Sequence, residues 1–200
     1  MKKTFTLLLT WFISASIIAQ PLLRAAPEDV GLDSKKLFQA DYIIGESIEK
    51  GEIPGAVLAV VKGNKIVYLK AYGNKAIFPA KQPMEVNTIF DLASVSKPLG
   101  AGISTMQLIE RGKLRLTDEV KMYIPGFRGY IDSVSGKETS IRIIDLLTHS
   151  SGLPPYAPVE VLVKKYGSPN PAGLMEYISS CKSDFEPTTK FQYSCLNFIT

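Results

Sequence analysis

The spacing of apolar residues predicts a helix and then a hairpin in the first half of the chain. Apolar side chains recur every three or four residues over 34–50, which predicts an amphipathic helix capped by Ser34. The apolar positions on its buried face are Leu37, Ala40, Ile44 and Ile48. Two runs rich in β-forming residues, 56–61 and 66–72, flank a Lys-Gly-Asn-Lys turn and predict a hairpin that is buried on at least one face. The polar, proline-containing stretch 73–87 predicts a loop.

The second half of the chain has the pattern of a mostly helical region. A long apolar helix is expected to begin near Ser94 and to end at about Glu110, before an Arg-Gly-Lys stop. Shorter apolar segments, separated by proline and glycine, predict small helices and loops at 120–124, 141–148, 158–166 and 171–179. Because a two-stranded hairpin makes a poor sheet by itself, and because the sequence stops at Thr200 within an apolar run, we expect an incomplete sheet in the N-terminal part of a longer protein.

Residues 1–19 have the pattern of a secretory signal peptide. Two lysines precede an uncharged run over 4–19 that is rich in large apolar residues. This run is shorter than the roughly 20 residues that a bilayer-spanning helix needs, which disfavours the alternative of an uncleaved membrane anchor. Cleavage after Ala19 removes two positive charges from a formal net charge of +4. We therefore expect an exported protein, periplasmic or secreted, whose folded part is 20–200 and which has no membrane span after cleavage.

Composition restricts the chemistry that the chain is expected to use. A hydrophobic fraction of 46% and a charged fraction of 21% are typical of a globular protein rather than of a disordered chain or a coiled coil. No run of five like charges occurs, so nucleic acid is not an expected partner. One histidine and two cysteines make a structural zinc site unexpected. Cys181 and Cys195 are expected to be two separate thiols, although an oxidising compartment would also allow a disulfide between them.

A serine three residues before a lysine is the main candidate for catalysis. On a helix this spacing places the hydroxyl beside the amine, which can then serve as its base. The pattern occurs at Ser47, Ser94 and Ser179, and roughly one or two occurrences are expected by chance. Ser47 and Ser179 lie at helix ends beside polar segments, whereas Ser94 follows an apolar approach over 89–93.

This context favours Ser94 as a nucleophile. We expect it at a helix N-terminus inside the core, with Lys97 buried beside it, because burial would lower the pKa of Lys97 and make it a usable base. Free backbone N–H groups at the same helix start would bind an oxyanion. The alternative is that Ser94 only caps the helix.

Four segments of the chain match, in order, the motifs of one enzyme family. They are GEIPGAV at 51–57 ahead of the hairpin, LASVSKP at 92–98, LLTHSSGL at 146–153 and FQYS at 191–194. They resemble the opening, the nucleophile motif, the LLTHTSGL segment and the start of the Tyr-x-Asn motif of the serine β-lactamase-like hydrolases. This family includes class C β-lactamases, DD-peptidases (penicillin-binding proteins) and related esterases.

The resemblance implies a fold and a mechanism. The fold would be α/β (α+β), of the β-lactamase/transpeptidase type, with an antiparallel sheet flanked by helices, a mostly helical subdomain, and the active site between them. The reaction would be hydrolysis of a β-lactam, a D-Ala peptide of the cell wall or an ester, through an acyl-enzyme on Ser94 and without metal or cofactor. Lys97 would hold or take the serine proton. Tyr193 would be the partner base, if neighbouring cations lower its pKa from about 10; otherwise it is an ordinary aromatic core residue.

Two departures from the family pattern concern the substrate site. Cys195 stands where the Tyr-x-Asn motif has asparagine, and a thiol is a poor hydrogen-bonding substitute for an amide. Cys195 and the nearby Asn197 are the substrate-binding candidates, and Cys195 favours peptide or ester substrates over β-lactams. The family's third motif, Lys- or His-Thr/Ser-Gly, is absent and would lie beyond position 200.

His149 is expected to be a hydrogen-bonded structural residue in a turn rather than a member of a catalytic triad, because no Gly-x-Ser-x-Gly motif accompanies it. The functional alternatives to a hydrolase are a non-catalytic binding or sensor domain on the same scaffold, and an inactive truncated chain.

Overall fold

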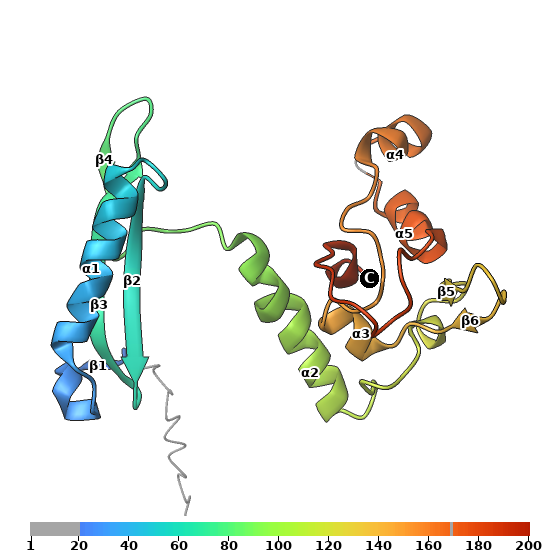
Figure 1. The fold of residues 1–200 in the computed structure, drawn as a ribbon, viewed down its shortest axis with the longest axis horizontal. Coiled ribbons are helices and arrows are strands. Elements are labelled where there is room, and N and C mark those ends of the chain that lie inside the picture. Colours follow the sequence, from blue (N-terminus) through green and yellow to red (C-terminus); the bar gives the residue numbers. More distant parts are fainter. Residues whose placement is uncertain (1–20, 169) are drawn as a thin grey trace, which may run out of the picture. The chain divides into compact units, whose positions relative to one another are not determined.

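The computed structural model describes residues 21–168 and 170–200. These residues form two compact units, the first ending at Phe90 and the second beginning at Asp91 (Figure 1). The predicted signal peptide at 1–19 lies outside the described residues. None of the helices in the described ranges is both long enough and apolar enough to cross a membrane.

The first unit is a small sheet with one helix beside it (Figure 1). Strands β2 (Gly55–Lys62) and β3 (Lys65–Ala76) form the predicted antiparallel hairpin. The short strands β1 (Leu23–Arg24) and β4 (Gln82–Pro83) also pair with β3, in parallel and antiparallel fashion respectively. The predicted loop over 73–87 therefore contains the end of β3 and all of β4. Strands of two residues are too short to show an alternation of apolar and polar residues, so the sequence pattern does not predict them.

Two glycines allow the hairpin to close against the end of the preceding turn. A Cβ added at Gly73, whose φ is +63°, would lie 2.5 Å from the carbonyl oxygen of Pro54. A Cβ added at Gly55 would lie 2.5 Å from the carbonyl oxygens of Tyr72 and Asn74. This close approach of backbones explains why glycine occupies the first position of β2 and position 73 of β3.

Helix α1 (Ser34–Glu49) covers the sheet, and its cap lies one residue earlier than expected. Asp33, not Ser34, is the cap: its Oδ1 accepts a hydrogen bond of 2.8 Å from the Lys35 amide. The four predicted core-facing residues, Leu37, Ala40, Ile44 and Ile48, are all half-buried, which confirms the predicted face.

One carboxylate joins α1 to β3. Asp41 accepts hydrogen bonds from the hydroxyls of Tyr68 and Tyr72 and pairs with Lys70 at 2.7 Å. Lys70 first, and then the two hydroxyls, lower the pKa of Asp41 to about 2. The helix therefore contacts the strand through a polar cluster in addition to its half-buried apolar face.

The second unit begins with a helical run that changes type along its length. A 3₁₀ turn at Ala93–Val95 and a π-helical turn at Lys97–Gly102 precede helix α2 (Ile103–Glu110). The predicted helix from Ser94 to Glu110 is thus present, but only its second half is α-helical. Pro98 has no amide N–H, and Gly100 and Gly102 have low helix propensity, which accounts for the irregular first half.

The rest of this unit consists of short helices and one small hairpin. Helices α3 (Ile143–Leu147), α4 (Val159–Tyr166) and α5 (Pro171–Ser180) and a 3₁₀ turn at Val120–Met122 confirm the predicted segments. Strands β5 (Tyr130–Ile131) and β6 (Glu138–Thr139) pair antiparallel and were not predicted, and a further 3₁₀ turn lies at Leu196–Phe198.

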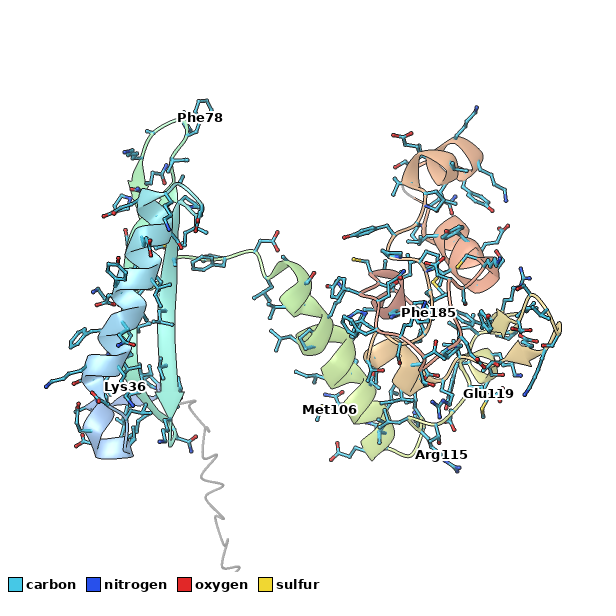
Figure 2. The ribbon with its side chains drawn as sticks, in the orientation of Figure 1. Lys36, Phe78, Met106, Arg115, Glu119 and Phe185 are labelled. Carbon is cyan, nitrogen blue, oxygen red and sulfur yellow. The ribbon has the colours of Figure 1, made fainter. Side chains whose placement is uncertain are left out.

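The apolar core of the second unit lies among its short helices rather than on α2. Its buried members are Val120, Phe127, Ile141, Leu146, Leu153, Ile178 and Leu196. Phe185 is also buried, whereas Met106 on α2 is 68% exposed (Figure 2). The apolar face of α2 is therefore not part of this core.

A buried carboxylate organises the start of α3. Asp145 is 1% exposed and accepts hydrogen bonds from the Arg142 backbone N–H at 2.9 Å and from its guanidinium at 3.0 and 3.2 Å. Every one of these donors belongs to the residue that precedes the helix, so Asp145 holds the entry of the chain into α3.

Replacing this carboxylate is expected to destabilise the second unit. We predict that Asp145→Ala lowers the free energy of unfolding by about 2 kcal/mol, measured by urea denaturation. The expected loss is smaller than for a fully buried ion pair because Arg142 is 41% exposed and stays solvated. Glu160→Ala, which removes an exposed acid from the first turn of α4, is the matched control and should change stability by less than about 0.5 kcal/mol. Equal losses in the two variants would contradict this assignment.

Candidate active site

A left-handed residue precedes the candidate nucleophile. Ala93 has a φ of +42°, a conformation that few non-glycine residues adopt. The turn is held by hydrogen bonds from the Ala93 amide to Asp91 Oδ1 and from the Val95 amide to the Leu92 carbonyl, both of 2.8 Å. Strained backbone of this kind is often found at functional sites, and here it sets the direction in which the chain enters Ser94.

Ser94 and Lys97 are joined by a direct hydrogen bond. Lys97 Nζ donates to Ser94 Oγ at 3.1 Å. The three-residue spacing predicted that the two side chains lie side by side. They do so although the backbone between them changes from a 3₁₀ to a π-helical turn. π-Helical turns are rare in proteins overall, and those that occur are often found at functional sites.

Tyr193 completes this group although it lies about a hundred positions later in the chain. Lys97 Nζ lies 5.1 Å from the centroid of the Tyr193 ring. The Lys97 ammonium, and secondly the Ser94 hydroxyl, lower the pKa of the Tyr193 phenol. The reciprocal effect of Tyr193 raises the pKa of Lys97, with a smaller contribution from Cys195. The two directions agree, because both describe a cation that stabilises a phenolate.

The predicted burial of Ser94 and Lys97 is wrong. Ser94 is exposed and Lys97 is half-buried, so desolvation of the amine is outweighed by its favourable partners. The pKa of Lys97 is accordingly raised, contrary to the prediction that burial would lower it. Lys97 is therefore held in its cationic form, and the phenol of Tyr193 loses its proton more easily than an ordinary tyrosine.

Tyr193 is placed by the pairing of two segments within the second unit. The Gln192 amide donates to the His149 carbonyl and the Cys195 amide donates to the Pro155 carbonyl, both at 2.9 Å. Between them the buried Ser194 hydroxyl donates to the Pro154 carbonyl at 2.6 Å. The segment 149–155 therefore holds the segment 192–195 on both sides of Tyr193.

Cys195 lies near the Lys97–Tyr193 pair and carries a free thiol. It is half-buried, and it makes a smaller contribution than Tyr193 to the raised pKa of Lys97. Cys181 is also free, which confirms the prediction of two separate thiols. Within the described ranges, no three His, Cys, Asp or Glu side chains are grouped so that they could hold a metal ion.

Asn197 does not have the position that a substrate contact requires. Its side chain is buried, its Oδ1 accepts a hydrogen bond of 2.6 Å from Ser151 Oγ, and its Nδ2 lies 3.3 Å from His149 Nδ1. Both ends of the amide are thus used inside the protein. The substrate-binding role considered for Asn197 is therefore not favoured by the geometry, whereas that of Cys195 is compatible with it.

His149 has the structural role that was predicted. It occupies a turn with a φ of +55°, and its Nδ1 accepts a hydrogen bond of 3.2 Å from the Ser194 amide. The sequence did not indicate that its ring stacks on Tyr193, with 4.3 Å between the ring centroids.

A comparison with protein families decides the relationship. The family model described as Beta-lactamase matches residues 40–199, which include Ser94, Lys97 and Tyr193. The chain belongs to the beta-lactamase family. The resemblance noted from the four motifs and the expected mixed α/β fold of the β-lactamase/transpeptidase type are both confirmed.

Individual relatives and solved structures agree with this result. The chain is 33% identical to a Salmonella gallinarum protein named "Putative D-alanyl-D-alanine carboxypeptidase", over 97% of this chain and 47% of that protein. It thus spans about half the length of the curated relatives that it matches.

Two solved structures show the same fold. EstCE1, a hydrolase with promiscuous acyltransferase activity, has a TM-score of 0.67 at 26% identity, covering 83% of this chain and 45% of the other. A class C beta-lactamase mutant has a TM-score of 0.62 at 28% identity, covering 87% and 43% respectively.

The coupling between Lys97 and Tyr193 can be measured without any substrate. We predict that Lys97→Met raises the pKa of the Tyr193 phenol, because it removes the cation that stabilises the phenolate. NMR titration of the protein with ¹³C-labelled tyrosine, assigned with Tyr193→Phe, measures this pKa. Lys190→Met removes an exposed lysine of the same segment and should leave the pKa unchanged. An unchanged pKa in Lys97→Met would show that the two groups are not coupled.

Proposed function

We propose that this member of the beta-lactamase family is an exported serine hydrolase that forms an acyl-enzyme on Ser94 from an amide or ester substrate. The observation that carries the proposal is the hydrogen bond of 3.1 Å between Lys97 Nζ and Ser94 Oγ, next to a phenol whose pKa is lowered. A serine hydroxyl is a weak nucleophile unless a base takes its proton, and this arrangement supplies such a base.

Each of the three side chains has a distinct part in the proposed reaction. Tyr193, as the phenolate, takes the proton of Ser94 while Oγ attacks the substrate carbonyl carbon. Lys97 keeps its proton, orients Oγ and balances the charge of the phenolate. The tetrahedral intermediate then collapses, and Tyr193 returns the proton to the leaving amine or alcohol. Water attacks the acyl-enzyme in the second half-reaction, with Tyr193 again as the base, and releases the acid and free Ser94.

A D-Ala peptide of the cell wall or a small ester is the substrate class that we propose. The name of the Salmonella relative supports the first, and the similarity to EstCE1, a hydrolase with acyltransferase activity, supports the second. Cys195 further favours these classes over β-lactams, because a thiol is a weak hydrogen-bond donor where the family pattern places an amide.

We propose export to the periplasm or the medium as the setting of this reaction. The support is the cationic start and the uncharged apolar run over 4–19, which are typical of a signal peptide. A cell-wall peptide would be accessible to the protein in that location.

Covalent labelling tests the nucleophile. We predict that a fluorescent penicillin or a fluorophosphonate labels the protein expressed from its own gene, and that Ser94→Ala abolishes the label, because it removes the serine hydroxyl that Lys97 Nζ contacts. Ser96→Ala, which removes an exposed serine two residues away, is the control and should label normally. Labelling that persists in Ser94→Ala would show that Ser94 is not the nucleophile. An unlabelled wild-type protein would favour a non-catalytic binding domain.

The substrate preference can be altered at Cys195. We predict that Cys195→Asn raises the acylation rate with penicillins about fivefold, the value of one net hydrogen bond of about 1 kcal/mol. Stopped-flow acylation with a chromogenic penicillin measures the rate. Cys181→Ser, which changes the other free thiol, is the control and should leave the rate unaltered. An equal acylation rate in Cys195→Asn and in the wild-type protein would show that Cys195 does not limit the reaction with penicillins.

A further inference from the structure

We propose that His149 is a positioning residue of the active site, and that its neutral imidazole, with the proton on Nε2, holds Tyr193 against Lys97 and Ser94. This proposal rests on the function proposed above. It concerns a residue that acts through Tyr193, because the hydrogen bonds among the described residues include none between His149 and Ser94.

A chain of buried hydrogen bonds determines which ring nitrogen of His149 carries the proton. The Leu153 amide donates to Ser151 Oγ at 3.1 Å, so the Ser151 proton goes to Asn197 Oδ1 at 2.6 Å. This orients the Asn197 amide, whose Nδ2 therefore faces His149 Nδ1 at 3.3 Å. The Ser194 amide points to the same nitrogen at 3.2 Å. Because both neighbours are donors, Nδ1 must be an unprotonated acceptor.

The His149 ring then serves as a platform for aromatic residues. The Tyr193 ring lies 4.3 Å from it, centroid to centroid, with an angle of 34° between the planes. Phe198 at 5.2 Å and Phe191 at 6.0 Å contact the same ring. The backbone carbonyl of His149 accepts from the Gln192 amide and Nδ1 accepts from the Ser194 amide. Both chain neighbours of Tyr193 are thus attached to His149, and so is its ring.

Protonation of His149 would undo this arrangement. The titratable groups that face its ring are Lys97 on the helical turn and Tyr193 on the paired segment. Burial first, and then the Lys97 cation, lower the pKa of His149 from 6.5, which keeps the ring neutral near pH 7. A proton on Nδ1 would oppose two donors and add a second positive charge near Lys97. We therefore expect Tyr193 to be displaced at acid pH, in addition to its own loss of base function.

The pH dependence of acylation tests this role. In the wild-type protein the rate of acylation by a fluorophosphonate should fall with a slope of one as Tyr193 is protonated, and with a slope of two over about one to two pH units below the pKa of His149. His149→Asn tolerates the left-handed backbone and lacks the ring, whereas His149→Phe keeps a ring and lacks the acceptor. Both variants should be acylated about 10- to 100-fold more slowly at neutral pH and should keep a slope of one throughout.

Controls separate positioning from general stability. Ser150→Ala removes a hydroxyl that is hydrogen-bonded to Thr148 and should retain the wild-type rate and profile. Circular dichroism across the pH range establishes that each variant is folded. If the His149 variants melt at a lower temperature but keep the wild-type rate and the steeper acid limb, His149 is only structural and the proposal is overturned.

NMR of the imidazole gives a second readout that needs no activity. His149 is the sole histidine of these 200 residues, and the signals of its ring nitrogens are assigned as those that His149→Asn lacks. We expect Nε2 to be protonated and Nδ1 unprotonated at pH 7, and the opposite tautomer would overturn the proposal. If the wild-type protein is acylated on Ser94 and the His149 variants behave like it, the positioning role fails alone. If Ser94 is never acylated, the proposed function fails and this role fails with it.

Discussion

The pairing of the segment around His149 with the segment around Ser194 is the constraint on which the candidate site depends. Ser94 and Lys97 lie side by side because they are three residues apart in a helical turn. Tyr193 lies near them because residues 192–195 are hydrogen-bonded to residues 149–155. The fastening uses buried polar groups: Ser194 is inaccessible and donates to the Pro154 carbonyl, and Asn197 bridges Ser151 and His149. An unpaired polar group in such a place would be costly, so the network specifies one register of the two segments.

Electrostatic interactions within the candidate site determine the charge states of Lys97 and Tyr193. Lys97 is half-buried, so desolvation lowers its pKa less than the phenol oxygen of Tyr193 raises it. The result is a lysine that stays charged and a tyrosine that ionises more easily. The expectation that burial lowers the pKa of Lys97 was wrong, because the stabilisation of the Lys97 cation by Tyr193 outweighs desolvation.

The sequence predicted those features that short-range patterns encode. The helical spacing of Leu37 and Ile44 predicted the face of α1, and the β-rich runs predicted the hairpin of β2 and β3. It did not predict β1, β4, β5 or β6, because a two-residue strand has no period, nor the π-helical turn that begins at Lys97. The family motifs brought Ser94, Lys97 and Tyr193 together before the structure did. They did not indicate that Asn197 is buried, because burial depends on Ser151 and His149, more than 40 positions away.

The alternation of side chains from Tyr193 to Cys195 explains why this short stretch bears on both reactivity and specificity. Ser194 is buried, whereas Tyr193 is exposed and Cys195 is half-buried, and both of these neighbours raise the pKa of Lys97. A change at Cys195 therefore alters a group beside the Lys97 cation as well as a potential substrate contact. Because Tyr193 is the larger influence on the pKa of Lys97, the cation persists when Cys195 changes. A substitution at position 195 is therefore expected to leave the electrostatic coupling between Lys97 and Tyr193 in place.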